Sequence, residues 1–482
     1  MDGIRSAGWR DVGESALDAS TADPIGDSNW GATVHSCRAN CASRYMGFSG
    51  RDGDPMTLLL MFLGLLTLVL INVPIAVSLG IVALSGMMLS SGMASLPNAA
   101  LVLFDGSTKF PLIAIPLFIL AGAIMNCTGI SIRLINLASA LVGFIRGGLA
   151  MVTVSASLFF AEISGSAVAD VAALGSILIP AMKDKGYPTP FAAAVTSSSA
   201  TLAVIIPPSI PMILYGVMSG SSVVELFVAG IVPGVLGGML MMVMVYILAL
   251  KNGFPVESTF QLQRVFKALR EASWALLLPV IILSGIFSGW VTATEGAGLA
   301  VLASIIIGGG VYRELDISAL RSAILSGGTQ TAVVMLLVAT SALLGDYLTE
   351  MQVPQSVAQG IMDFTDNRWA ILALLNVFFI LVGLFLHSAA AIILVVPIVM
   401  PLVLAAGIDP VHFGLVVTLN LGIGQQTPPV ASVLVTACSV AKADIWEVSK
   451  VNLYFVSILL FMLLLVTYVP AIPMWPVELF YR

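Results

Sequence analysis

Charged residues are scarce in this sequence. The chain of 482 residues has 20 Lys and Arg and 26 Asp and Glu, which make up 10% of its length, whereas a soluble globular chain has about 25%. Hydrophobic residues make up 59%, and the mean hydropathy is +1.04. This composition excludes a disordered chain, a nucleic-acid-binding protein with a basic face and an ordinary cytosolic enzyme. A chain of this kind is expected to lie in a lipid bilayer.

Motifs of several enzyme classes are also missing. No GxxxxGK[ST] occurs, so nothing indicates that the chain itself uses ATP. No HExxH and no GxSxG occurs, and there are only three histidines. An intramembrane zinc protease or a lipase-like hydrolase would lack its essential parts. We therefore expect neither an enzyme nor a protein with a bound cofactor.

Residues 1–55 differ from the rest of the chain. They hold five Arg and eight acidic residues among many Gly, Ser, Ala and Asp, and they show neither helical nor strand periodicity. They also lack an apolar stretch long enough for a secretory signal. We interpret them as a disordered tail or an upstream extension, and we expect the membrane domain to be residues 56–482, starting at Met56.

Eight uninterrupted apolar stretches have the length of a membrane helix, about 20 residues. They lie near 57–72, 74–91, 111–127, 223–250, 273–290, 294–312, 325–345 and 452–472. Two further regions, 147–220 and 368–440, are apolar but interrupted by Gly, Ser, Thr and Pro. An uninterrupted pair of helices would not need such interruptions.

The two interrupted regions resemble each other at an offset of 221 residues. Pro180 then matches Pro401, and the pair Pro207-Pro208 matches the next Pro-Pro pair at 428–429. Interrupted segments at corresponding places in two halves are the best sequence indication of a transporter binding site. We expect an all-α polytopic membrane protein with two repeats, near 111–220 and 330–440. Each repeat would consist of a re-entrant hairpin and a transmembrane helix broken by proline.

The positions of the basic residues predict how the repeats are oriented. We assume that the first hairpin spans 149–182 and the broken helix spans 190–220, and that successive loops alternate between the two sides of the membrane. Twelve of the fifteen basic residues after position 55 then lie on one side. That side is cytoplasmic by the positive-inside rule. The second hairpin then opens from the opposite face, so the repeats are inverted. The exceptions are Lys109, Arg368 and Arg482.

The Pro-Pro breaks are the strongest candidate for a functional site. Proline removes a backbone donor and interrupts the helix, and the freed carbonyls must be satisfied within the bilayer. Oxygen ligands from carbonyls and hydroxyls suit a desolvated Na⁺, and the start of a half-helix suits an anion. The hairpin tips SGSA (164–167) and HSAA (387–390) would complete each cation site. The alternatives are a simple proline kink and a packing face of small residues.

Several polar residues near the breaks and tips are candidates for binding the substrate. They are Glu162, Asp170, Ser199, Thr201, Gln425 and Gln426. An ionisable residue within a membrane is a functional candidate, although Glu162 at the mouth of a cavity would be solvated. His387 beside the second tip is either a pH-sensitive gate or a structural hydrogen-bonding residue. Glu295 is expected to cap the helix that follows it.

Three runs, FFAEISGSAVADVAALGSILIPAM, SSSATLAVIIPPSIPMILYG and NLGIGQQTPPVASVL, resemble the large, DctM-type membrane subunit of tripartite ATP-independent periplasmic (TRAP) transporters. The resemblance extends from about Met56 to the C-terminus. It implies inverted repeats, an elevator-type movement and Na⁺-driven uptake of a carboxylate across the bacterial inner membrane. It also implies two partners, a small four-helix membrane subunit and a periplasmic substrate-binding protein. Gln425-Gln426 departs from the apolar pair of many members.

The resemblance also implies two Na⁺ sites, formed largely by backbone carbonyls. The first maps to the tip residues Ala161, Ser164, Gly165 and Ser166 and to the break residues Ala203, Ile206 and Pro208. The second maps to the tip residues Gly383 and Ser388 and to the break residues Gly424, Thr427 and Val430.

Two other functions remain as alternatives. One is a stand-alone Na⁺-coupled anion carrier of the same fold, which needs no binding protein. The other is a membrane scaffold without transport activity, in which disrupting the hairpin tips would leave function intact.

Overall fold

The computed structural model describes residues 55–71, 73–164, 166–257, 259–428 and 430–481. It does not describe the side chains of Glu162, Ile163 and Ser164, among a few others. Residues 1–54 of the predicted tail lie outside the described residues, and only its last residue, Pro55, is described. Gly165 also lies outside the described residues.

The described residues are helical, with no strand among them. The first half contains α2 (Pro55–Leu70), α3 (Ile75–Ser91), η1 (Gly92–Ser95), α4 (Leu96–Thr108), η2 (Phe110–Ile113), α5 (Ala114–Cys127), α6 (Ile130–Val142), α7 (Gly148–Ser164), α8 (Ala167–Asp184), α9 (Thr189–Ala200), η3 (Thr201–Val204), α10 (Ile210–Ser219) and α11 (Val223–Asn252). The second half contains α12 (Leu262–Phe287), α13 (Ala293–Ile305), the π-helix η4 (Ile306–Val311), α14 (Ile317–Glu350), α15 (Val353–Met362), α16 (Arg368–Phe385), α17 (Ser388–Ala405), α18 (Pro410–Gly424), α19 (Ser432–Ala441), α20 (Ile445–Tyr468) and α21 (Ala471–Tyr481).

Helix bounds in the two halves correspond at the same offset of 221 residues. The offset carries α8 (Ala167–Asp184) onto α17 (Ser388–Ala405) without a difference at either end. At the same offset, α7 corresponds to α16, α9 to α18 and α10 to α19, with small differences at the helix ends. The correspondence extends further than the sequence indicated, because α4, η2 and α5 together cover the counterpart of the single long helix α14. The order of elements is therefore the same in both halves.

The predicted spans each contain a helix, with two differences in length. Helix α12 starts at Leu262 and α14 starts at Ile317, well before the predicted 273 and 325. The Asp316 side chain accepts a hydrogen bond from the Ala319 amide at 2.6 Å, which caps α14 and fixes its earlier start. Likewise Thr292 and Glu295 form the predicted cap of α13 as a reciprocal pair.

Helix α4 was not predicted, because Pro, Asn and Asp interrupt its apolar pattern. It continues into α5 through the 3₁₀ turn η2, where Pro111 lacks the amide that a continuous α-helix would need. Eight helical segments among the described residues are long and apolar enough to cross a membrane, and α16 and α17 are two of them. Helices α2 and α3 are shorter, at 16 and 17 residues.

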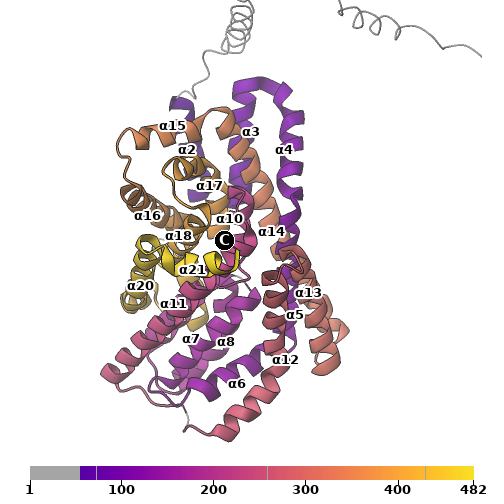
Figure 1. Ribbon diagram of the computed structural model, residues 1–482, viewed down its shortest axis with the longest axis vertical. Helices are drawn as coiled ribbons and strands as arrows, with labels where there is room; N and C mark the ends of the chain where they lie inside the picture. Colours follow the sequence, from indigo (N-terminus) through magenta and orange to yellow (C-terminus); the bar gives the residue numbers. More distant parts are fainter. Residues whose placement is uncertain (1–54, 72, 165, 258, 429, 482) are drawn as a thin grey trace, which may run out of the picture. The chain divides into compact units, whose positions relative to one another are not determined.

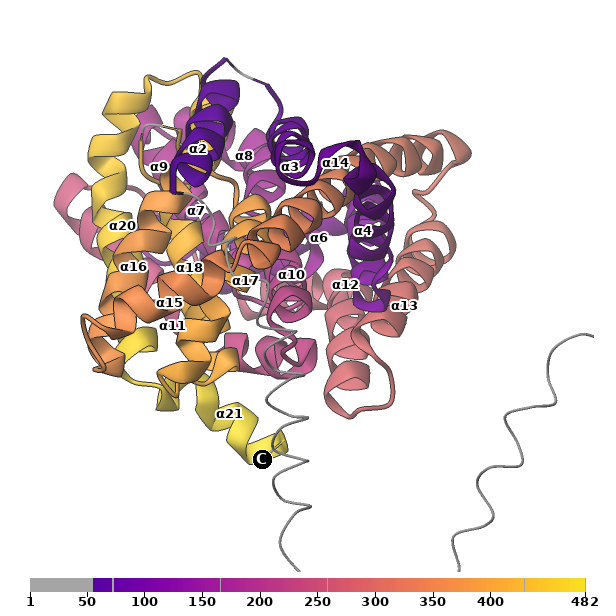
Figure 2. The ribbon, with the colours of Figure 1, turned by 90° about the horizontal axis from the view of Figure 1, so that it is seen from above.

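Helix α14 packs against several other helices. It contacts α3, α4, α5 and α17, and Figure 2 shows it running between α4 and α17. Helix α5 packs on α13 and α14. The two hairpin pairs differ in packing: α7 packs along α8, whereas α16 packs mainly on α18, and α17 packs on α15, α10 and α14. Helix α7 of the first hairpin thus packs on α5, and α17 of the second hairpin packs on α14. We call α5 and α14 the frame.

The short helices α6 and α15 lie near opposite ends of the bundle in Figure 1. Arg133 of α6 forms a bidentate ion pair with Glu314, with N–O distances of 2.7 and 2.9 Å. The Arg133 guanidinium carbon also lies 3.8 Å from the ring centre of Tyr312. Arg264 of α12 donates to Ser139 of α6 at 3.1 Å. These contacts join α6 to α12 and to the segment before α14.

Candidate functional site

The first break separates η3 from α10. Pro207 and Pro208 have no amide hydrogen, so helical hydrogen bonding cannot continue through residues 205–209. The Ser209 hydroxyl donates to the Val204 carbonyl at 2.6 Å and accepts from the Met212 amide at 3.5 Å. One serine thereby satisfies a carbonyl freed by the break and caps α10.

The second break separates α18 from α19 at residues 425–431. The Thr427 hydroxyl donates to the Ile423 carbonyl at 3.3 Å, and the Thr427 amide donates to the Gly424 carbonyl at 3.0 Å. Ala431 has a φ of 42°, which lies in the left-handed region and reverses the chain before α19. Each break therefore has hydrogen bonds of its own among its described residues.

The second hairpin touches the second break directly. A Cβ on Gly424 would lie 2.6 Å from Cα and C of Gly383, and a Cβ on Gly383 would lie 3.1 Å from Cα of Gly424. The end of α16 and the end of α18 therefore approach at backbone distance, which only glycine allows. Ser388 starts α17 and is buried, whereas Val430 is exposed. The residues predicted for the second Na⁺ site thus include two whose backbones are in contact.

The residues predicted for the first Na⁺ site are mostly buried. Ala161 of α7 and Ala203 of η3 are fully buried, and α7 packs against η3. Ile206 and Pro208 are buried in the break. Ser164 ends α7, and its side chain, like Gly165 and the side chain of Glu162, lies outside the described residues.

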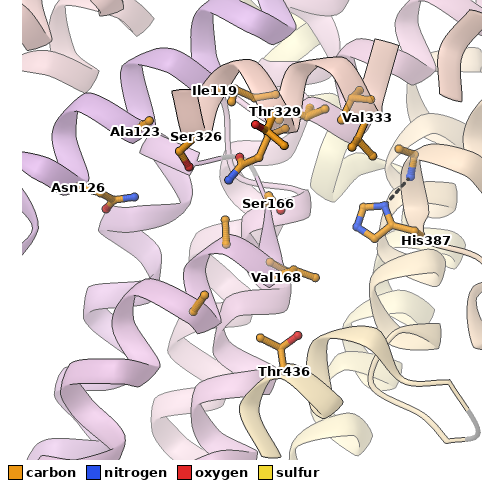
Figure 3. Close-up of a pocket in the computed structure, with 18 of the residues that line it drawn as sticks. Ile119, Ala123, Asn126, Ser166, Val168, Ser326, Thr329, Val333, His387 and Thr436 are labelled. Carbon is orange, nitrogen blue, oxygen red and sulfur yellow. Dashed lines mark hydrogen bonds between the residues drawn. The ribbon is translucent and has the colours of Figure 1, made fainter. Parts of the chain in front are cut away.

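A cavity of about 740 Å³ lies where both tips, both breaks and the frame meet. Figure 3 shows Ser166, Val168 and Thr436 on one side of it, and Ser326 and Thr329 on the other. Four helices begin at its wall, because the lining includes the first residues of α8, α10, α17 and α19. The start of a helix has unpaired amides and a partial positive charge. The four helix starts thus place their partial positive charges at the cavity wall.

The wall of the cavity on α14 is polar. Ser322, Ser326, Thr329 and Gln330 lie on one face of the helix at helical spacing and all line the cavity. Asn126 of α5 lies beside them (Figure 3). None of these residues was predicted, although four polar residues at this spacing within an apolar span were a visible signal. The polar wall supplies hydroxyls and amides opposite the tips.

The described lining contains no Lys, Arg, Asp or Glu. The predicted candidates Ser166, Ser388 and Gln425 are part of it. Gln425 is 2% exposed, and its Nε2 has no hydrogen-bond partner among the described residues, while its Oε1 accepts from Ser432 at 3.4 Å. The His387 ring accepts from the Ala389 amide at 3.4 Å, which caps α17 (Figure 3). His387 thus makes a structural hydrogen bond and also faces the cavity.

Four other substrate candidates lie outside the lining. Asp170 is fully buried in the first turn of α8. Ser199 pairs with the Ser157 hydroxyl at 2.9 Å. Thr201 and Gln426 bond to each other between the two breaks. The structure therefore brings Gln425 to the cavity and places its neighbour Gln426 in a buried network.

Comparisons with known proteins agree on one family. The sequence model described as "Tripartite ATP-independent periplasmic transporter, DctM component" matches residues 62–472. The isethionate TRAP transporter permease DctMQ of Oleidesulfovibrio alaskensis is 41% identical over 88% of this chain and 66% of its own length. The C4-dicarboxylate TRAP large permease DctM of Pseudomonas aeruginosa is 40% identical over 78% of this chain and 88% of its own.

The sialic acid TRAP large permease SiaM of Vibrio cholerae is 37% identical over 86% of this chain and 97% of its own. In three dimensions, the chain is similar to the YdaH transporter of Alcanivorax borkumensis. That comparison has a TM-score of 0.59 and 17% identity, and it covers 80% of this chain and 90% of the other. This identity supports a shared fold alone.

Proposed function

This chain belongs to the DctM family, the large permease subunits of TRAP transporters, and from that premise we propose that it imports a carboxylate by coupling its entry to Na⁺. As a permease it is a transport protein and not an enzyme, and it is a multi-pass protein of the inner membrane. The relatives are named for different substrates, namely isethionate, C4-dicarboxylates and sialic acid. These substrates share an anionic group.

The observation that carries the proposal is the convergence of four helix starts on a cavity with no charged side chain in its described lining. An anion at this position is stabilised by helix amides and partial charges rather than by an arginine. The hydroxyls and amides on α14 suit the remaining polar groups of an organic acid. Gln425 also lines the cavity, with an Nε2 that is buried and has no hydrogen-bond partner among the described residues.

Na⁺ bound in the two breaks would balance the negative charge of the proposed substrate. We place the ions at the carbonyl ends of η3 and α18, beside Ala203 and Gly424, where a partial negative charge favours a cation. The backbone contact between Gly383 and Gly424 supports the second position. We further propose that the two hairpins and broken helices are inverted repeats that move together as an elevator against α5 and α14. The equal order of elements in the two halves supports this proposal.

We propose a small membrane subunit and a periplasmic binding protein as partners. The family is described as tripartite, and the name DctMQ of one relative indicates that its large and small permeases form one chain. The binding protein would supply the substrate and much of the specificity.

Reconstitution tests the function. The purified permease and small subunit are placed in liposomes, with the binding protein outside, loaded with an organic acid found by thermal-shift screening. We expect accumulation with an inward Na⁺ gradient and none with K⁺ or without the binding protein. Uptake without the binding protein would favour the stand-alone carrier, and no uptake by folded protein would favour the scaffold.

A further inference from the structure

One glutamine joins the two breaks. Gln426 follows the end of α18, yet its side chain reaches the end of α9 in the other half. Its Oε1 accepts from the Ser197 hydroxyl at 2.6 Å, and its Nε2 donates to the Ser197 carbonyl at 2.9 Å and to the Thr201 hydroxyl. All three residues are at most 1% exposed. Both the oxygen and the nitrogen of the Gln426 side-chain amide therefore bond to residues of the first half of the chain.

A third helix holds the same glutamine from the other side. Asn452 of α20 donates to the backbone carbonyl of Gln426 at 3.3 Å and to its Oε1 at 3.2 Å. The Ser198 hydroxyl donates to Asn452 at 2.5 Å. The network thus connects α9, the second break and α20. A buried network in which each member is satisfied is rigid, because losing one bond leaves a desolvated partner.

The backbone of α18 also meets side chains of η3 at this point. A Cβ on Gly422 of α18 would lie 2.9 Å from a Thr201 side-chain carbon and 3.0 Å from one of Val204. Residues 201–204 form η3, which leads into the first break. The two carbonyl ends that we assigned to Na⁺ are therefore packed against each other as well as hydrogen-bonded.

We propose that Gln426 is a positioning residue that couples the two cation sites, so that Na⁺ binding at one break favours binding at the other. This inference rests on the proposed Na⁺ function. Na⁺ bound at one break holds Gln426 in place and, through the hydrogen bonds of Gln426, favours the binding arrangement of the other break. The second ion then binds more tightly, which is positive cooperativity without a change of fold. Gln426 itself binds neither ion nor substrate.

Isothermal titration of Na⁺ into the purified protein, with choline chloride holding the ionic strength constant, tests the coupling. We expect a Hill coefficient above 1 for the wild-type protein. For Gln426→Leu we expect a coefficient of 1 and a half-saturating Na⁺ concentration raised about fivefold or more. Ser197→Ala removes one bond of the network with less change in volume, and we expect a smaller shift in the same direction.

A matched control is Asn376→Leu. Asn376 is a buried amide that bonds to Asn420 at 2.7 Å and to Thr467 at 3.1 Å, all within the second half. Its loss should lower the melting temperature but leave the Hill coefficient unchanged. If Gln426→Leu does not fold, Ser197→Ala carries the test.

The outcomes separate the coupling from the function. A wild-type protein that binds no Na⁺ would overturn the proposed function and, with it, the coupling. A wild-type protein that binds Na⁺ with a Hill coefficient of 1 would overturn the coupling alone. The coupling would also be overturned if the Hill coefficient of Gln426→Leu stays at its wild-type value. It would likewise be overturned if the Hill coefficient of Asn376→Leu falls as much as that of Gln426→Leu.

Discussion

The contact between Gly383 and Gly424 makes a sharp prediction. In Gly424→Ala the new methyl group would lie 2.6 Å from Cα and C and 3.0 Å from O of Gly383. Ordinary van der Waals contact begins at 3.4 Å, so the end of α16 and the end of α18 must separate by about 0.8 Å to restore it. Both neighbours are backbone atoms, which have no rotamer with which to avoid the methyl group.

The separation should weaken the proposed second Na⁺ site. Overpacking of this kind costs about 1–3 kcal/mol. If that cost falls on the ion-binding arrangement, half-saturation by Na⁺ rises roughly 5- to 150-fold, since each ~1.4 kcal/mol is a factor of ten. The polar wall of the cavity on α14 is not touched, so the maximal rate at saturating Na⁺ should fall much less.

The assay is the initial rate of uptake into proteoliposomes over a series of Na⁺ concentrations. The control is Gly298→Ala in α13, where a Cβ meets nothing within 4 Å and where alanine favours the helix by up to about 1 kcal/mol. The control should transport as the wild type does. Wild-type Na⁺ dependence in Gly424→Ala would refute the view that this close approach forms an ion site.

Three further predictions concern other parts of the molecule. The hydrogen bonds from Arg133 lower the pKa of Glu314 in the folded protein. The pKa of an unfolded glutamate is about 4.3. The ion pair therefore stabilises the fold fully above that pH, and this stabilisation is lost as the pH falls through the lowered pKa of the folded state. The melting temperatures of wild type and Glu314→Gln should therefore differ at pH 7, and the difference should shrink as the pH falls below about 4.3; a difference that does not change with pH would contradict this. Thr329→Val in the polar wall should raise the KM for loaded binding protein several-fold, whereas Thr340→Val should not. Both hydroxyls bond to a carbonyl of their own helix, but only Thr329 lines the cavity, so equal effects would count against a substrate role for the wall. Thr427→Val removes a hydroxyl from the second break and should sharply lower Na⁺-dependent uptake, and unchanged uptake would remove Thr427 from the ion site.

Proline and small residues made the breaks and tips predictable. Local chemistry decides where a helix must stop, so the sequence located the break at Pro207 and the turn before Ser388 to within a few residues. The bounds of α8 and α17 follow from the same 221-residue offset that the prolines indicated. These features depend on neighbours along the chain, which a sequence displays directly.

Contacts between distant segments were not predictable in the same way. Gln426 was expected to face the substrate, but it bonds to Ser197, which lies 229 residues earlier in the chain. Nothing in the local pattern separates it from Gln425, which does face the cavity. The polar wall of α14 was not predicted for another reason. Ser322 precedes the predicted span at 325–345, and Ser326, Thr329 and Gln330 lie at the start of that span, before its apolar stretch.

The central claim is that Na⁺ entry drives substrate entry through the two breaks. Simultaneous measurement of radioactive Na⁺ and labelled substrate in the same proteoliposomes tests it most directly. The account predicts that both accumulate together in a fixed ratio, that both require the loaded binding protein, and that Gly424→Ala lowers both at low Na⁺. Substrate accumulation without Na⁺ entry would contradict it.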